Sequence, residues 1–192
     1  MDRRRVALWV GVGALCVTAL VAVVAIVVGE FDEASARVLI AAWAIALYAV
    51  LMLVCAAAND RRPVLAGAGL VACAVGAVLA IAAVVAWNDA SDSLVKATFA
   101  AFVVAFALAH SALLEWRRRA GDAPTVRGLL AATYICIAVV AAMLVYAIVA
   151  ADTDAQAEGG YFRALGVALV LDVLGTALVP LLRKLSRASA AP

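Results

Sequence analysis

The sequence predicts an all-α membrane protein, and three observations lead to this fold class. Of the 192 residues, 69% are hydrophobic and 15% are charged, whereas soluble domains are nearer half apolar and a quarter charged. Six stretches reach the roughly 20 apolar residues that a helix needs to cross about 30 Å of hydrocarbon. No stretch alternates in polarity over the length of a membrane strand. The same composition, with 4 prolines and 4 cysteines, excludes a disordered chain and a disulfide-rich secreted module.

Residues 1–192 form one predicted domain in which six spans alternate with short polar segments. The spans are expected at residues 6–28, 37–58, 64–87, 96–114, 128–150 and 161–182. The first span follows three arginines, as in a signal peptide, but its apolar run of 23 residues exceeds the roughly 7–15 of a signal core. We therefore expect the first span to be retained.

The distribution of charge predicts the orientation of these spans. The N-terminus, the C-terminal tail and the segments after the second and fourth spans together carry twelve of the fifteen Lys and Arg residues. Eight of the thirteen acidic residues lie on the opposite side. Cytoplasmic segments collect Lys and Arg, so we expect a multi-pass protein of the cytoplasmic membrane with both termini cytoplasmic. The basic residues are sufficiently explained as topology signals, and no nucleic-acid partner is expected.

A recurring spacing suggests an internal repeat. In the first, third and fifth spans a cysteine lies 16 residues before an aspartate, in the pairs Cys16 and Asp32, Cys73 and Asp89, and Cys136 and Asp152. This register fits three tandem two-helix hairpins. The alternative is chance, because Ala- and Val-rich helices align in many registers.

Three of the cysteines lie at similar depth, near the middle of their spans. Cys16, Cys73 and Cys136 could meet on a threefold pseudo-axis and bind a soft metal such as Cu(I). No pair of Met or His residues accompanies the thiols, and the favoured alternative is that each cysteine is a small residue in helix packing. We expect no cofactor.

Asp172 is the one acidic residue inside a span, about 16 Å into the sixth. Such a carboxyl should face protein or water, because exposure to lipid is unfavourable. Small and polar residues share its helix face at Ala168, Asp172, Gly175 and Thr176, and Pro180 predicts a kink nearby. This pattern is typical of a permease binding site. It also fits a neutral Asp172 that makes an ordinary inter-helix hydrogen bond.

His110, the single histidine, lies in the fourth span beside Ser111. Counted along parallel helices, His110 is about 7 Å nearer the cytoplasm than Asp172. A direct contact between the two therefore needs shifted or tilted helices, whereas a water could bridge them. Asp172, Thr176, His110 and Ser111 together form the candidate binding or proton-relay site. Alternatively, His110 hydrogen-bonds a neighbouring helix or reaches the headgroups.

Residue counts argue against an enzyme. One histidine and one carboxylate inside the spans cannot form an intramembrane metalloprotease site or a bis-histidine haem site. Ser111 and His110 are adjacent on one helix and point about 100° apart, which disfavours a catalytic dyad. No Gly-rich phosphate-binding loop is present.

Residues 115–127 form the longest segment expected outside the bilayer on the cytoplasmic side. Trp116 should lie at headgroup level, and Arg117, Arg118 and Arg119 should attract anionic lipid. We interpret these four residues as membrane anchors. Besides lipid, the expected partner is another membrane protein or a second copy of the chain.

Residues 107–114 (ALAHSALL) and 163–180 (RALGVALVLDVLGTALVP) are similar to segments of uncharacterised six-span integral membrane proteins of actinobacteria and haloarchaea. The resemblance implies the six-span fold. That group has no established activity, so it implies no site residues.

Two functions remain open. The leading hypothesis is a non-enzymatic accessory or scaffold protein embedded in the membrane, because the spans are mostly apolar and rich in small residues. The alternative is a small-solute or proton-coupled permease or channel that uses Asp172.

Overall fold

The computed structural model describes residues 13, 20, 33–118, 121–150 and 159–188. Within this part the chain is helical and contains no strand. The helices are α2 (Glu33–Ala57), α3 (Pro63–Val85), α4 (Asp92–Arg117), α5 (Pro124–Val149) and α6 (Gly159–Ala188). All but two residues of the first predicted span, 6–28, lie outside the described residues.

All five helices are long and apolar enough to cross a membrane, judged by length and composition. Large apolar side chains such as Val64, Val85 and Ile135 are exposed on the outside of the helices. A water-soluble protein does not expose apolar surface on this scale. The fold is therefore that of a helical, membrane-embedded protein.

The helices begin a few residues earlier than the apolar stretches suggest. Pro63 and Pro124 each stand at the first turn of a helix, where proline has a favourable backbone angle and no N–H is needed. The hydroxyl of Ser91 accepts a hydrogen bond from the backbone N–H of Leu94 and caps α4, which starts at Asp92. Hydropathy marks the apolar part of each helix, whereas these capping signals mark where the helix begins.

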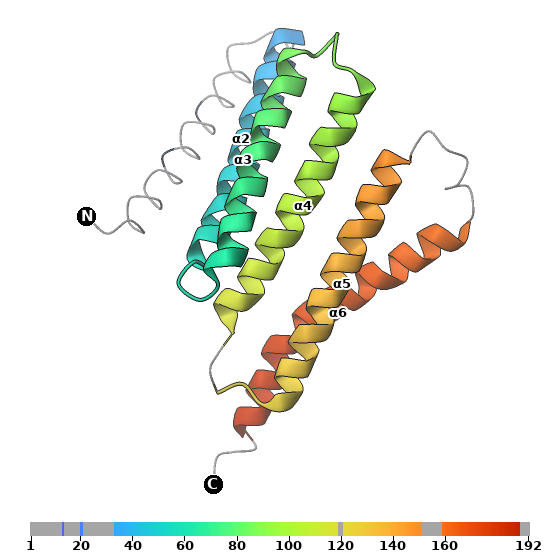
Figure 1. Ribbon diagram of the computed structural model, residues 1–192. Helices are drawn as coiled ribbons and strands as arrows, with labels where there is room; N and C mark the ends of the chain where they lie inside the picture. Colours follow the sequence, from blue (N-terminus) through green and yellow to red (C-terminus); the bar gives the residue numbers. More distant parts are fainter. Residues whose placement is uncertain (1–12, 14–19, 21–32, 119–120, 151–158, 189–192) are drawn as a thin grey trace.

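Helices α2, α3 and α4 pack together, α5 lies against α4, and α6 pairs with α5 (Figure 1). Small residues bring α2 and α3 close. The ring of Tyr48 on α2 lies over Gly76 of α3 and meets Phe102 of α4 edge-on, with 6.3 Å between ring centroids. Nearby, the thiol of Cys55 lies over Gly69. Both glycines are buried, so each allows a larger side chain of α2 to sit directly on the α3 backbone.

Helix α6 turns one face to the rest of the protein. Leu165, Ala168, Asp172, Gly175, Thr176 and Val179 are buried or partly buried, whereas residues 169–171, 173 and 174 are exposed. Gly175 packs directly against Thr133 of α5. Figure 1 also shows that α6 is bent rather than straight. The face that the sequence indicated as small and polar is thus the one that contacts protein.

The contact between Gly76 and Tyr48 predicts an intolerance to any side chain at position 76. In Gly76→Ala the added Cβ would lie 2.6 Å from ring atoms of Tyr48, so the helices must separate or the ring must move. We expect a loss of about 1–3 kcal/mol of stability, measured as a lower midpoint of thermal unfolding in detergent. Gly67→Ala on the same helix is the matched control, because a Cβ there meets nothing within 4 Å. Equal midpoints for the two variants would contradict the close α2–α3 contact.

Candidate functional site

The residues of the predicted polar site come from α4 and α6, and the structure brings three of the four together. Nε2 of His110 and Oγ1 of Thr176 are hydrogen-bonded at 3.0 Å. Nδ1 of His110 lies 3.8 Å from Oδ2 of Asp172, which is too long for a hydrogen bond but within the range of an ion pair. No hydrogen bond among the described residues joins Ser111 to this group, which we call the His110 cluster.

The approach of His110 to Asp172 is closer than a count along parallel helices suggests. That count separates the two residues by about 7 Å in depth, whereas the structure places ring and carboxylate 3.8 Å apart. The two helices are therefore not straight and parallel here, and Figure 1 shows that α6 is bent. The ring of His110 also contacts Phe106, with 6.3 Å between centroids, which restricts its orientation.

One oxygen of the Asp172 carboxyl group lacks a hydrogen-bond partner in the described part of the chain. Its side chain is 13% exposed, and its Oδ1 atom is buried without a hydrogen-bond partner in the described part of the chain. A buried acceptor without a partner is unfavourable, and a protonated carboxyl or a water would relieve it. Chemically, the His110 cluster can hold a proton between an imidazole and a carboxyl, or it can simply join α4 to α6.

A second polar cluster, the Glu115 cluster, lies at the end of α4. The carboxylate of Glu115 is buried, with 6% of the residue exposed. Its Oε1 atom accepts from Nε of Arg62 and from Nη1 of Arg118, both at 3.2 Å. Its Oε2 atom accepts from the hydroxyl of Tyr134 at 2.9 Å. The carboxylate thus joins the segment before α3, the end of α4 and the middle of α5.

Arg61 also binds the C-terminal end of α4, through backbone carbonyls rather than through the carboxylate of Glu115. Its Nη1 atom donates to the backbone carbonyls of Glu115, at 3.2 Å, and of Trp116 and Arg118. These carbonyls belong to the last turn of α4 and to Arg118, which follows the helix. The carbonyl of Glu115 also accepts the backbone N–H of Arg118, and the side chain of Arg61 adds donors at a helix end where carbonyls run short of backbone partners. A cation at this position also complements the negative end of the helix dipole.

Sequence reasoning did not identify the Glu115 cluster. Glu115 was grouped with the cytoplasmic acidic residues, and Arg61 and Arg62 were interpreted as topology signals. The segment from Glu115 to Arg127 was also expected outside the helices, whereas α4 extends to Arg117 and α5 begins at Pro124. The available signal was one acidic residue two positions before three consecutive arginines, which is a common pattern for a solvated helix end.

The predicted membrane anchors are only partly described. Trp116 and Arg117 are exposed at the end of α4, as an anchoring role requires, whereas Arg118 is partly buried against Glu115. Arg119 lies outside the described residues. Anchoring by these residues stays a prediction.

The cysteines are arranged by helix packing in the described part. Cys55 of α2 and Cys73 of α3 are buried in the same cluster of core residues. Cys136 is partly buried on α5, and Cys16 lies outside the described residues. The described residues contain no group of three or more His, Cys, Asp or Glu that could hold a metal. The soft-metal hypothesis therefore stays a prediction that the described residues do not test.

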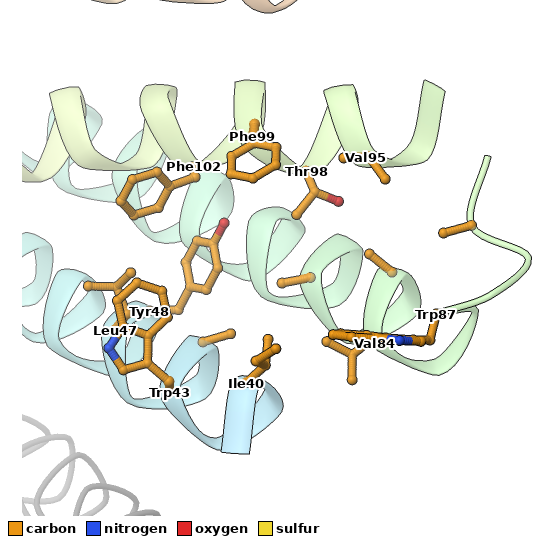
Figure 2. Close-up of a pocket in the computed structure, with 14 residues that line it drawn as sticks. Ile40, Trp43, Leu47, Tyr48, Val84, Trp87, Val95, Thr98, Phe99 and Phe102 are labelled. Atoms are coloured by element: carbon orange, nitrogen blue, oxygen red, sulfur yellow. The ribbon is translucent and has the colours of Figure 1, made fainter. Parts of the chain in front are cut away.

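An apolar pocket of about 450 Å³ lies between α2, α3 and α4 (Figure 2). Aromatic side chains contribute much of its lining, and Figure 2 shows Trp43 and Tyr48 on one side and Phe99 and Phe102 on the other. None of the described residues that line it is charged. Such a lining is suited to a hydrocarbon group.

The Glu115 cluster predicts a measurable contribution to stability. Glu115→Gln removes the charge but keeps the shape, so Arg62 and Arg118 lose their carboxylate partner. Both guanidinium groups are partly exposed and can regain water, so we expect a loss of about 1–3 kcal/mol, less than for a fully buried pair. The measurement is the midpoint of thermal unfolding in detergent.

The matched control for this experiment is Glu33→Gln, which weakens an exposed ion pair with Arg37. We expect the control to cost less than about 1 kcal/mol. If Glu115→Gln were no more destabilising than the control, the carboxylate would not hold these segments together.

Comparisons with protein-family models, with curated proteins and with solved structures found no match. They therefore do not bear on the resemblance of residues 107–114 and 163–180 to six-span bacterial and archaeal proteins, which stays a prediction. The function has to be inferred from the geometry of this chain.

Proposed function

We propose that this protein is a non-enzymatic accessory or scaffold component embedded in the membrane. The observation that carries the proposal is that the polar groups of the spans join helices of the protein to one another. His110 of α4 is bonded to Thr176 of α6, and Glu115 joins α4 to α5 through Tyr134. The apolar pocket between α2, α3 and α4 is lined by other residues than His110, Thr176 and Asp172. This arrangement favours a structural role for the polar residues over a solute pathway.

We further propose six spans in three tandem hairpins, in the cytoplasmic membrane, with both termini cytoplasmic. The uneven distribution of Lys and Arg along the sequence supports this orientation. The arrangement of the helices is compatible with it, because the α2–α3 connection, the end of α4 and the C-terminal end of α6 lie toward the same end (Figure 1). The partners of such a component are lipid and another membrane protein or a second copy of the chain.

A specific observation favours the alternative of a proton-coupled permease or channel. Oδ1 of Asp172 is buried without a hydrogen-bond partner in the described part, and Oδ2 lies 3.8 Å from the ring of His110. An ionisable pair at this depth is typical of proton relays in transporters. Under this alternative Asp172 would exchange a proton during each transport cycle, and Thr176 and His110 would orient the substrate or the proton.

The substitution Asp172→Asn distinguishes the two functions. Under the proposed scaffold role, wild-type proteoliposomes should show no more proton flux than empty liposomes, as measured with an enclosed pH-sensitive dye. Asp172→Asn should leave the flux unchanged. It should change the free energy of unfolding by less than about 1 kcal/mol, because asparagine keeps the size and polarity of the side chain. Thr98→Val is the control, because the hydroxyl of Thr98 bonds to the backbone carbonyls of Leu94 and Leu79, outside the His110 cluster.

A proton flux in the wild type that Asp172→Asn abolishes and Thr98→Val preserves would overturn the scaffold role in favour of the permease. The scaffold role also requires a protein partner. Cross-linking in intact membranes should therefore place the chain in a species larger than the monomer, for the wild type and Asp172→Asn alike. A monomer in both would contradict the proposal.

A further inference from the structure

We propose that the arginine-rich end of the protein carries a binding site for a phosphate group. A pocket of about 220 Å³ lies there, and the residues that line it are Arg62, Arg118, Arg127, Leu130, Ala131 and Tyr134. We call it the arginine pocket. It does not include any residue of the His110 cluster, so the inference holds for a scaffold and for a permease alike.

The charges of the arginine pocket do not cancel. Its three arginines come from three segments: Arg62 precedes α3, Arg118 follows α4 and Arg127 lies in the first turn of α5. The carboxylate of Glu115 contacts Arg62 and Arg118. The residues that line the pocket include three arginines and no acidic residue, so the lining itself is cationic and an anion can neutralise it. Guanidinium groups are the side chains best matched to phosphate oxygens.

Contacts with one buried carboxylate hold two of these partly exposed guanidinium groups in position. Glu115, which is 6% exposed, binds Arg62 and Arg118 through the same oxygen, and its second oxygen holds the hydroxyl of Tyr134. The positions of two arginines are therefore set before any ligand binds. A pre-arranged site spends less of its interaction energy on ordering side chains than a flexible polybasic segment does.

Two helix N-termini add to the positive potential at this end. Helix α3 begins directly after Arg62, and α5 begins at Pro124, one turn before Arg127. Neither N-terminus has a hydrogen bond from a capping side chain. The first backbone N–H groups of a helix are unpaired within the helix and attract anions.

The size of the arginine pocket limits the ligand. Its volume of about 220 Å³ is below the roughly 300–1,000 Å³ of pockets that enclose whole drug-sized ligands. A single phosphate group fits this limit, whereas a nucleotide exceeds it. Two sources share the chemistry: the headgroup of an anionic phospholipid and free inorganic phosphate. The apolar side chains of Leu130 and Ala131 in the lining favour the lipid source.

The test measures thermal unfolding of the full chain in a neutral detergent as a function of added probe. The probes are phosphatidylglycerol, with phosphatidylcholine as its zwitterionic control, and sodium phosphate, with sodium chloride at equal ionic strength as its control. A ligand that binds the folded state raises the midpoint with concentration and yields an apparent Kd. Stabilisation by phosphatidylglycerol alone assigns the site to a lipid headgroup, and stabilisation by phosphate as well assigns it to phosphate in general.

Substitutions locate the site. The ion pairs of Glu115 are with Arg62 and Arg118. Arg127→Gln should therefore leave the Glu115 cluster intact while weakening the apparent affinity for the effective probe about tenfold. Arg117→Gln removes the same charge from the same end but not from the pocket lining, and it should leave the affinity within about twofold. Ala131→Phe fills the pocket without changing charge and should also weaken binding.

Two results would overturn the proposal. One is that neither phosphatidylglycerol nor phosphate stabilises the wild type beyond its control. The other is that Arg117→Gln weakens binding as much as Arg127→Gln, because the attraction would then be a general property of the charged end. If Arg127→Gln fails to fold, the comparison of Ala131→Phe with the wild type decides, and unchanged binding by that variant would equally overturn the site.

Discussion

Hydrocarbon offers no hydrogen bonds, so a polar group inside a span has to find its partner within the protein. This constraint explains where the polar side chains of the described helices lie. Thr98 and Thr133 bond to carbonyls of the preceding turn of their own helices, and His110 and Glu115 bond to other segments. Among the described residues, three side-chain atoms are buried without such a partner: Nε of Arg37, the hydroxyl of Tyr48 and Oδ1 of Asp172. The constraint is least well met at these three positions.

The sequence predicted the membrane class and the last five spans because both depend on local composition, which hydropathy reports directly. It could not predict how the helices pack. On α6 the small and polar residues marked the inner face, but on α2, α3 and α5 apolar residues surround the helix and no single face is marked as the inner one. Gly67 and Gly76 illustrate the difficulty: both are glycines of α3, yet a Cβ at Gly67 meets open space and one at Gly76 meets Tyr48. Only the partner helix distinguishes them.

The two polar clusters differ in how far the sequence could predict them. His110 and Asp172 stood out because a titratable residue inside an apolar span is rare, and their proximity required only that α6 depart from a straight, parallel path. Glu115 did not stand out, because an acidic residue beside arginines at a helix end is ordinarily solvated. It is buried because the segment with Arg61 and Arg62 folds over the end of α4, which is a contact across more than 50 residues. Such a contact leaves no trace in local composition.

Contacts at glycines and directional hydrogen bonds determine different features of the helix packing. Glycines such as Gly76 and Gly175 set how closely neighbouring helices approach, since a bare backbone accepts a side chain directly. Dispersion between apolar surfaces is not directional, however, and it would tolerate one helix sliding along another. The hydrogen bonds of Glu115 and of Arg61 are directional and each has one acceptable position. The polar end therefore fixes the register of α3, α4 and α5, and the small residues fix their spacing.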